Sequence, residues 1–179
     1  MDLNYTRTAK GLHWLMALLM LGLLGLGFYM QGLPLSPEKL QLYAWHKWAG
    51  VTVFLLGIVR LAWRATHQPP ALPAGMPRLQ QWTAQATHVL LYLLMLAIPL
   101  SGWLMSSAKG FQTVWFGVLP LPDLLAKDKA LGDLLVTLHL SLNLLLVGLL
   151  VAHVGATLKH HFIDKDDVFL RMLPKFGKV

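Results

Sequence analysis

Four long stretches of the chain are almost entirely apolar, and more polar segments separate them. Each stretch approaches or exceeds the roughly 20 apolar residues that a helix needs to cross a bilayer with some tilt. Backbone polar groups inside lipid must be paired within the protein, so the pattern predicts an all-α, integral membrane four-helix bundle. We expect one domain over residues 1–179, with helices at about 11–30, 44–64, 85–106 and 134–160.

The segments between these stretches differ in character. The link at 66–80, "THQPPALPAGMPRLQ", is rich in proline and cannot continue a helix. The link at 107–133 is longer and contains Trp115 and Phe116, which suit a membrane interface, so we expect a short surface helix or a cap there. The first apolar stretch is longer than a typical signal-peptide core and lacks a convincing cleavage site, which favours a retained first helix.

Composition supports a membrane protein and narrows its chemistry. Hydrophobic residues make up 56 % of the chain, charged residues 13 %, and the mean hydropathy is +0.56. The chain has no cysteine. Disulfides, thiolate-bound iron–sulfur clusters and covalently attached c-type haem are therefore excluded.

The net charge of +7 does not indicate a nucleic-acid partner, because the basic residues lie at helix ends and in links. The positive-inside rule then predicts that both termini are cytoplasmic. The predicted cytoplasmic side holds ten basic residues: Arg7, Lys10, Arg60, Arg64, Arg78, Lys159, Lys165, Arg171, Lys175 and Lys178. The other side holds five: Lys39, Lys47, Lys109, Lys127 and Lys129.

The fourth stretch carries two histidines, His139 and His153, fourteen residues apart. In a helix this spacing gives a rise of about 21 Å and a rotation within about 40° of four whole turns. Both rings therefore project from one face, too far apart for a single metal ion. Two cofactors stacked along the helix can each take one ring, whereas the plainer interpretation is polar contact between helices.

Histidines in the other apolar stretches are expected at the same depths in the membrane as His139 and His153. His46 lies at the depth of His139, whereas both His13 and His88 lie at the depth of His153, and depth alone does not choose between them. Zinc would favour four clustered ligands, often including carboxylates or thiolates, which the helices do not offer near these residues. Paired axial imidazoles in apolar surroundings fit b-type haem, so we infer two haem b groups, one near each membrane face.

Three further residues each follow a histidine by fourteen positions, so each is expected at the depth of one of the two cofactors. Gly27 and Gly102 follow His13 and His88 by fourteen residues, so they lie at the depth of the outer cofactor and leave room for a flat ring. Arg60 follows His46 by fourteen residues and would suit a haem propionate. The plainer interpretations are ordinary helix packing for the glycines and an interfacial, snorkelling arginine.

The segments around these histidines, together with the C-terminal one, resemble the bacterial cytochrome b561 family over nearly the whole chain. They read "GLHWLM", "AWHKWAG" and "LKHHFIDKDDVFLRMLPK", and the fourth stretch adds its two histidines. The resemblance implies a four-helix, dihaem cytochrome linked to quinone, in the bacterial inner membrane. It also implies that His46 and His139 bind the outer haem, and His13 and His153 the inner one.

The resemblance is closest to enterobacterial members of the family that act as superoxide oxidases. It implies that superoxide is oxidised to O₂ at the periplasmic face and that electrons pass through two haems to ubiquinone. Lys47, next to a predicted haem ligand, would attract the superoxide anion. The other outer lysines are equally well explained as solvated residues balanced by aspartates.

Quinone reduction also needs protons, and we expect His88 and His160 to serve as a quinone site or proton relay. An ordinary interfacial histidine is the alternative for His160. A second functional hypothesis is an electron-transfer subunit that relays electrons from a dehydrogenase or periplasmic partner to quinone. An exposed apolar or complementary patch on the 107–133 link would favour it. A haem carrier is disfavoured, because cargo that is released needs weaker ligation than two histidines.

Overall fold

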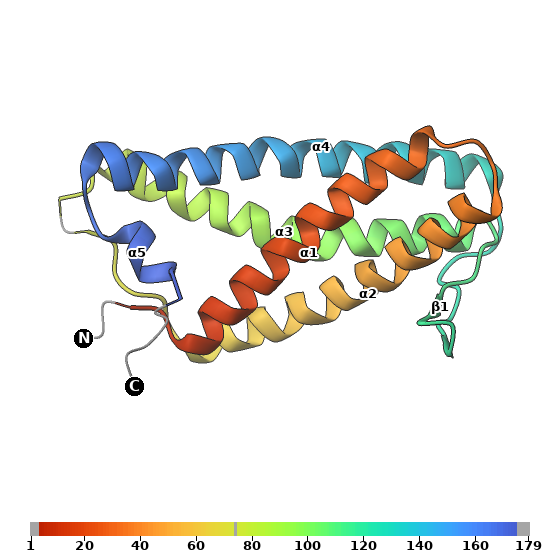
Figure 1. Cartoon of the computed structure of the whole chain (residues 1–179), viewed down its shortest axis with the longest axis horizontal. Coiled ribbons are helices and arrows are strands. Elements are labelled where there is room, and N and C mark those ends of the chain that lie inside the picture. The colour runs from red at the N-terminus through yellow and green to blue at the C-terminus, as the bar shows by residue number, and fades with distance from the viewer. Residues whose placement is uncertain (1–3, 74, 175–179) are drawn as a thin grey trace.

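The computed structural model describes residues 4–73 and 75–174, and its main body is a bundle of four long helices (Figure 1). Each of them is long and apolar enough to cross a membrane. Neighbours along the chain pack against one another, α1 on α2, α2 on α3 and α3 on α4. The helices are α1 (Arg7–Gly32), α2 (Pro37–Thr66), α3 (Arg78–Ala108) and α4 (Lys129–Lys159).

The helices extend beyond the apolar stretches that predicted them because polar capping residues, rather than the lipid boundary, fix where they begin. The side chains of Thr6, Ser36 and Asp128 accept hydrogen bonds from backbone N–H groups in the first turns of α1, α2 and α4. Pro37 takes the first position of α2, where its missing N–H has no partner to lose. The four predicted helices are confirmed. Seven of their eight ends lie two to seven residues further out than predicted, and α4 ends one residue earlier, at Lys159.

Few side chains are fully buried, and many large apolar ones are exposed on the helix surfaces. A small core of Met16, Val53 and Met95 joins α1, α2 and α3. Leu18 and Val151 remain 68 % and 69 % exposed. An apolar exterior of this kind is what lipid, rather than water, requires.

One end of the bundle carries a β-hairpin, and we call it the hairpin end. The hairpin pairs β1 (Val114–Trp115) with β2 (Leu119–Pro120), and its turn places Phe116 and Gly117 at φ 52° and 72°. Trp48 Nε1 donates to Val114 O and Trp115 Nε1 donates to Trp48 O, which fastens the hairpin to α2. The surface helix considered for this link is thus wrong: positive φ angles at the turn select a tight hairpin.

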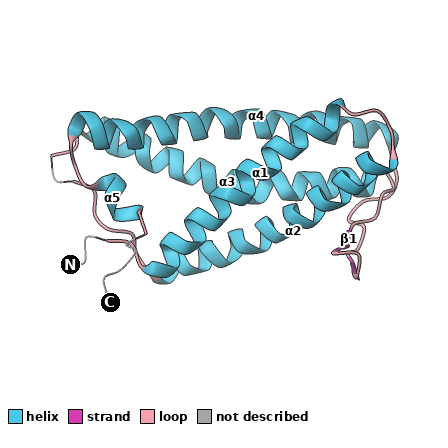
Figure 2. Cartoon of the chain, in the orientation of Figure 1, coloured by secondary structure: helices cyan, strands magenta, loops and turns pink. Residues whose placement is uncertain are grey.

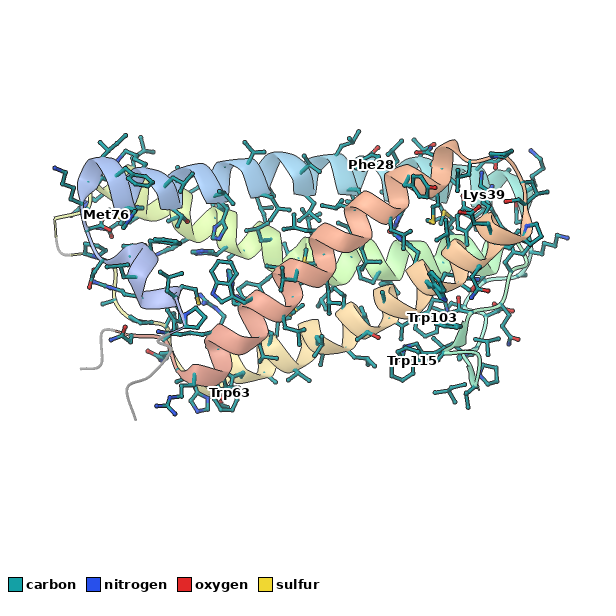
Figure 3. All side chains as sticks on the ribbon, viewed as in Figure 1. Phe28, Lys39, Trp63, Met76, Trp103 and Trp115 are labelled. Carbon is teal, nitrogen blue, oxygen red and sulfur yellow. The ribbon has the colours of Figure 1, made fainter. Side chains whose placement is uncertain are left out.

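We call the opposite end, where α1 begins, the terminal end (Figures 1 and 2). There α4 runs into the π-helical turn η1 (His160–Asp164), and α5 (Val168–Met172) folds back toward α1. Lys10 Nζ donates to Leu173 O at 2.9 Å and Trp14 Nε1 donates to Met172 O at 3.0 Å. The C-terminal segment therefore packs against the first turns of the chain. Figure 3 shows Trp63 at this end and Trp103 and Trp115 at the other.

Candidate functional site

Two pairs of histidines face each other inside the bundle, one toward each end. At the hairpin end, His46 of α2 and His139 of α4 have ring centroids 6.5 Å apart, with planes at 78°. Toward the terminal end, His13 of α1 and His153 of α4 have centroids 6.3 Å apart, with planes at 40°. The fourteen-residue spacing on α4 thus places one imidazole in each pair.

His88 of α3 also lies against His153, with ring centroids 5.4 Å apart. When two imidazoles bind one metal ion, the distance between their ring centroids is fixed by the metal–nitrogen bonds. Two metal–nitrogen bonds of about 2 Å, plus a ring radius on each side, give roughly 6 to 6.5 Å between centroids. The His46–His139 and His13–His153 separations match this value, and the His88–His153 separation is too short.

Gly27 and Gly102 lie where the sequence predicted, at the depth of the hairpin-end pair. A Cβ on Gly27 would lie 3.3 Å from His46 Cε1, and a Cβ on Gly102 would lie 3.2 Å from His139 Cε1. Both are closer than ordinary van der Waals contact. The glycines therefore make room for the imidazole rings themselves, which adds to the room they leave for a flat group.

The hairpin-end pair borders an apolar cleft with about 440 Å³ of empty space, part of which is open to the surroundings. Besides the two histidines, aliphatic and methionine side chains dominate its lining, with Asn143 the main polar exception. Nδ1 of His46 and Nδ1 of His13 are buried and have no hydrogen-bond partner among residues 4–73 and 75–174. A flat, apolar cofactor bound through imidazole nitrogen fits this donor set, and a hydrated cation does not.

His139 has a polar neighbour, Ser101, that the sequence did not single out. The Ser101 hydroxyl donates to Ile98 O at 2.7 Å, so at 2.9 Å from His139 Nδ1 it acts as the acceptor of the imidazole proton. This arrangement assigns the proton to Nδ1 and leaves Nε2 of His139 with its lone pair for a metal. The sequence offered one indication, because Ser101 precedes Gly102, which was expected to lie beside the outer cofactor. No sequence rule, however, pairs Ser101 with His139.

Arg60 lies near the terminal-end pair on α2, as its place in the sequence suggested. Its Nε donates to the Tyr92 hydroxyl at 3.3 Å, and its guanidinium lies over the Tyr92 ring. Tyr5 lines a small pocket at the terminal end together with Arg60 and Tyr92, and burial raises the pKa of the Tyr5 phenol. Arg60 is thus turned inward against aromatic residues, which differs from the snorkelling alternative.

Lys47 follows His46 and points to the hairpin end. Its Nζ donates to Ser106 Oγ, Phe111 O and Gln112 O at 3.1 to 3.3 Å, so three neutral oxygens hold the ammonium in place. No carboxylate among the described residues pairs with it. Lys109 and Lys129, in contrast, both pair with Asp133.

His160 is buried in the π-helical turn at the end of α4. Its Nδ1 lies 2.6 Å from Asp166 Oδ2, and Gln80 Nε2 donates to its Nε2 at 3.2 Å. Both ring nitrogens are engaged, so His160 joins α3 to the C-terminal segment. Nearby, the hydrogen bond from Arg171 lowers the pKa of Asp167.

Comparison with known proteins agrees with this architecture. The family model described as prokaryotic cytochrome b561 matches residues 4–175. "Cytochrome b561 homolog 2" of Escherichia coli K12 is 37 % identical over 96 % of this chain and 92 % of its own length. "Cytochrome b561 homolog 1" of the same organism is 29 % identical over 96 % and 98 %. "Probable superoxide oxidase CybB" of Yersinia pestis is 27 % identical over 98 % of both chains.

Proposed function

Since the chain belongs to the prokaryotic cytochrome b561 family of haem-containing membrane electron-transfer proteins, we propose that it is a dihaem superoxide:quinone oxidoreductase. In this proposal, superoxide is oxidised to O₂ at the hairpin end and ubiquinone is reduced at the terminal end. Sites at both ends are needed, because substrate and acceptor would approach from opposite membrane faces.

One observation carries the proposal: two imidazole pairs, at opposite ends of one bundle, have ring separations that fit a shared metal ion. His46 and His139 would hold one haem b, and His13 and His153 the other. Haem b held by two imidazoles exchanges single electrons without needing an open coordination site. The shorter separation between the rings of His88 and His153 supports a ligand set without His88.

The overall reaction balances with the groups available. Two superoxide anions lose one electron each and leave as O₂, and one quinone gains both electrons and two protons. Lys47 supports the first half, because its fixed charge would attract an anion beside His46. His88 and His160 are our candidates for contact with quinone or for proton delivery, and Asp166 would keep the His160 ring oriented.

Lys47 offers a direct test of superoxide attraction. Lys47→Gln should lower the second-order rate constant for superoxide several-fold and weaken its dependence on salt, since electrostatic attraction is screened by ions. Stopped-flow measurement of haem reduction at several ionic strengths gives both quantities. Lys129→Gln is the matched control, because Asp133 already pairs with that lysine. An unchanged rate in Lys47→Gln would reject this role.

The function itself is tested by spectra of the purified, oxidised protein during superoxide generation, with superoxide dismutase as control. Fast haem reduction that the dismutase abolishes, followed by reoxidation when quinone is added, supports the proposal. Haems that stay oxidised under superoxide but are reduced by dithionite would reject superoxide as donor.

That second outcome would favour the alternative, an electron-transfer subunit with a protein donor. One observation supports this alternative: apolar side chains at the hairpin end are highly exposed, with Phe111 at 65 %, Phe116 at 57 % and Val118 at 83 %. A partner docking there would cover them, as would the lipid interface.

A further inference from the structure

A pocket at the terminal end brings two arginines onto one aromatic ring. It lies between the start of α1, the last turns of α2, Tyr92 of α3 and Met172 of α5, and its roughly 340 Å³ of empty space is partly open to the surroundings. The guanidinium carbons of Arg60 and Arg64 lie 5.6 Å and 5.3 Å from the centre of the Tyr92 ring. Like charges four residues apart on a helix repel each other, so an anion bound between these two arginines would stabilise the arrangement.

The described part of the chain supplies no carboxylate to these arginines. None of the ion pairs among residues 4–73 and 75–174 includes Arg60 or Arg64. The aspartates described at this end already have other basic partners: Asp164 pairs with Lys159, Asp166 with His160 and Asp167 with Arg171. Arg60 is half-buried and Arg64 is exposed, and the described residues provide no anion to pair with either of them.

The two tyrosines add hydrogen-bond donors to the pocket. The Tyr92 hydroxyl accepts from Arg60 Nε, which leaves its own proton available to donate. Burial raises the pKa of Tyr5, and Arg64 and Arg60 oppose this effect only in part, so its phenol keeps its proton at neutral pH. Two guanidiniums and two hydroxyls together suit a planar carboxylate or a phosphate.

We propose that Arg60 and Arg64, with Tyr5 and Tyr92, form a binding site for an anionic carboxylate or phosphate group. The favoured source is a propionate of the haem held by His13 and His153, and this choice of source rests on the proposed function. Arg60 lies at the depth of that histidine pair, and Arg64 lies one turn, about 6 Å, nearer the terminal end. The other source of the same chemistry is the phosphate of a lipid headgroup.

The experiment compares the full-length protein with Arg64→Gln, Arg60→Gln and the charge-keeping variant Arg64→Lys. Arg78→Gln is the matched control, because Arg78 is an exposed arginine at the same end that does not line the pocket. Each protein is reconstituted with haem b or with its dimethyl ester, which has no propionate charge. Haem loss to a scavenger apoprotein is then timed, and the haem-to-protein ratio is measured.

If a propionate occupies the site, esterification should speed the loss of one haem roughly ten- to a hundredfold in the wild type and in Arg78→Gln. That effect should disappear in both glutamine variants and partly persist in Arg64→Lys, because the mutation and the ester remove the same interaction. A second arm compares thermal unfolding in nanodiscs of phosphatidylglycerol and phosphatidylcholine. If a lipid phosphate occupies the site, the anionic lipid should stabilise the wild type and Arg78→Gln but not the two glutamine variants.

The proposal is overturned if neither the ester nor the lipid charge distinguishes the pocket variants from Arg78→Gln. It is also overturned if Asp2→Asn reproduces Arg64→Gln in both arms, because the chain's own Asp2, which lies outside the described residues, would then supply the anion. Failure of the proposed function has a different signature. Neither His13→Ala nor His88→Ala would then change the haem-to-protein ratio, and the lipid arm would still test the pocket.

Discussion

At the scale of single residues, the buried histidines carry the same side chain but differ in their surroundings. His139 donates its Nδ1 proton to Ser101, whereas Nδ1 of His13 and of His46 has no partner among the described residues. His88 differs again, since it contacts His153 too closely to share a metal ion with it. Identical side chains therefore have different roles in the proposed sites, and substituting them one at a time should give different effects.

The choice between His13 and His88 is tested by haem content. His13→Ala should reduce the haem-to-protein ratio from two to about one, because the remaining imidazole does not hold haem firmly alone. His88→Ala should keep both haems. The pyridine haemochrome assay on the purified variants measures the ratio. The reverse pattern would mean that His88, and not His13, is the ligand.

Ser101 is expected to lower the midpoint potential of the hairpin-end haem. A hydrogen bond from Nδ1–H makes the imidazole a stronger donor to oxidised iron. Ser101→Ala should therefore raise that potential by about 20 to 60 mV, the equivalent of one ordinary hydrogen bond. Spectroelectrochemical titration measures both haems at once, so the terminal-end haem is an internal control. Ser101→Thr keeps the hydroxyl and should leave the potential near the wild-type value.

The histidine pairs were largely predictable from the sequence, and the polar contacts around them were not. Helical rise and rotation are fixed, so the spacing of His139 and His153 is enough to locate two sites along α4. The same rule gives only depth, which is why His13 and His88 stayed equivalent. Tyr92 and Ser101 meet Arg60 and His139 across helix boundaries, and such contacts depend on helix rotation, which periodicity leaves open.

At the scale of elements, glycine governs how closely helices approach at the hairpin-end site. Gly102 on α3 and Gly27 on α1 each face an imidazole, whereas Gly148 on α4 has nothing within 4 Å of a Cβ. Of these three, only the first two can matter for ring placement. The small residues along these helices are therefore unequal in function, although they look alike in the sequence.

Gly102→Ala is expected to disturb the hairpin-end site alone. The new Cβ would force His139 away by a few tenths of an ångström, and the hairpin-end haem should dissociate about tenfold faster. Gly148→Ala should leave haem loss unchanged and slightly stabilise its helix. Kinetics of haem transfer to a scavenger measure both variants. Equal haem loss in the two proteins would contradict the importance of the contact.

The hairpin in the 107–133 link shows where sequence reasoning about elements failed. Its turn contains Phe116 and Gly117 at positive φ, instead of the Asn-Gly or Asp-Gly pairs that signal a tight turn. Phe116 tolerates this backbone because two hydrogen bonds with Trp48 of α2 hold β1 in place, and β2 pairs with β1. The starts of α1, α2 and α4 follow the ordinary capping residues Thr6, Ser36 and Asp128, but apolarity alone predicted these starts four to seven residues too late.

At the scale of the whole molecule, the absence of cysteine from the chain makes its orientation measurable. We expect the hairpin end to face the periplasm and the terminal end the cytoplasm. Lys129→Cys, at a side chain 92 % exposed, should react with an impermeant maleimide on intact spheroplasts. Gln68→Cys, exposed in the link between α2 and α3, should react only after permeabilisation. The opposite labelling pattern would invert the topology.

Helix α4 contributes one histidine to each pair, which limits where residues can be inserted into this chain or deleted from it. One helix supplies His139 and His153, so a single residue inserted between them would turn one ring about 100° away from its partner and abolish that pair. Links have no such constraint, because lengthening a surface loop costs little free energy. Insertions and deletions among natural variants should therefore fall at 66–80 and 107–133, while the stretch from 139 to 153 keeps a constant number of residues.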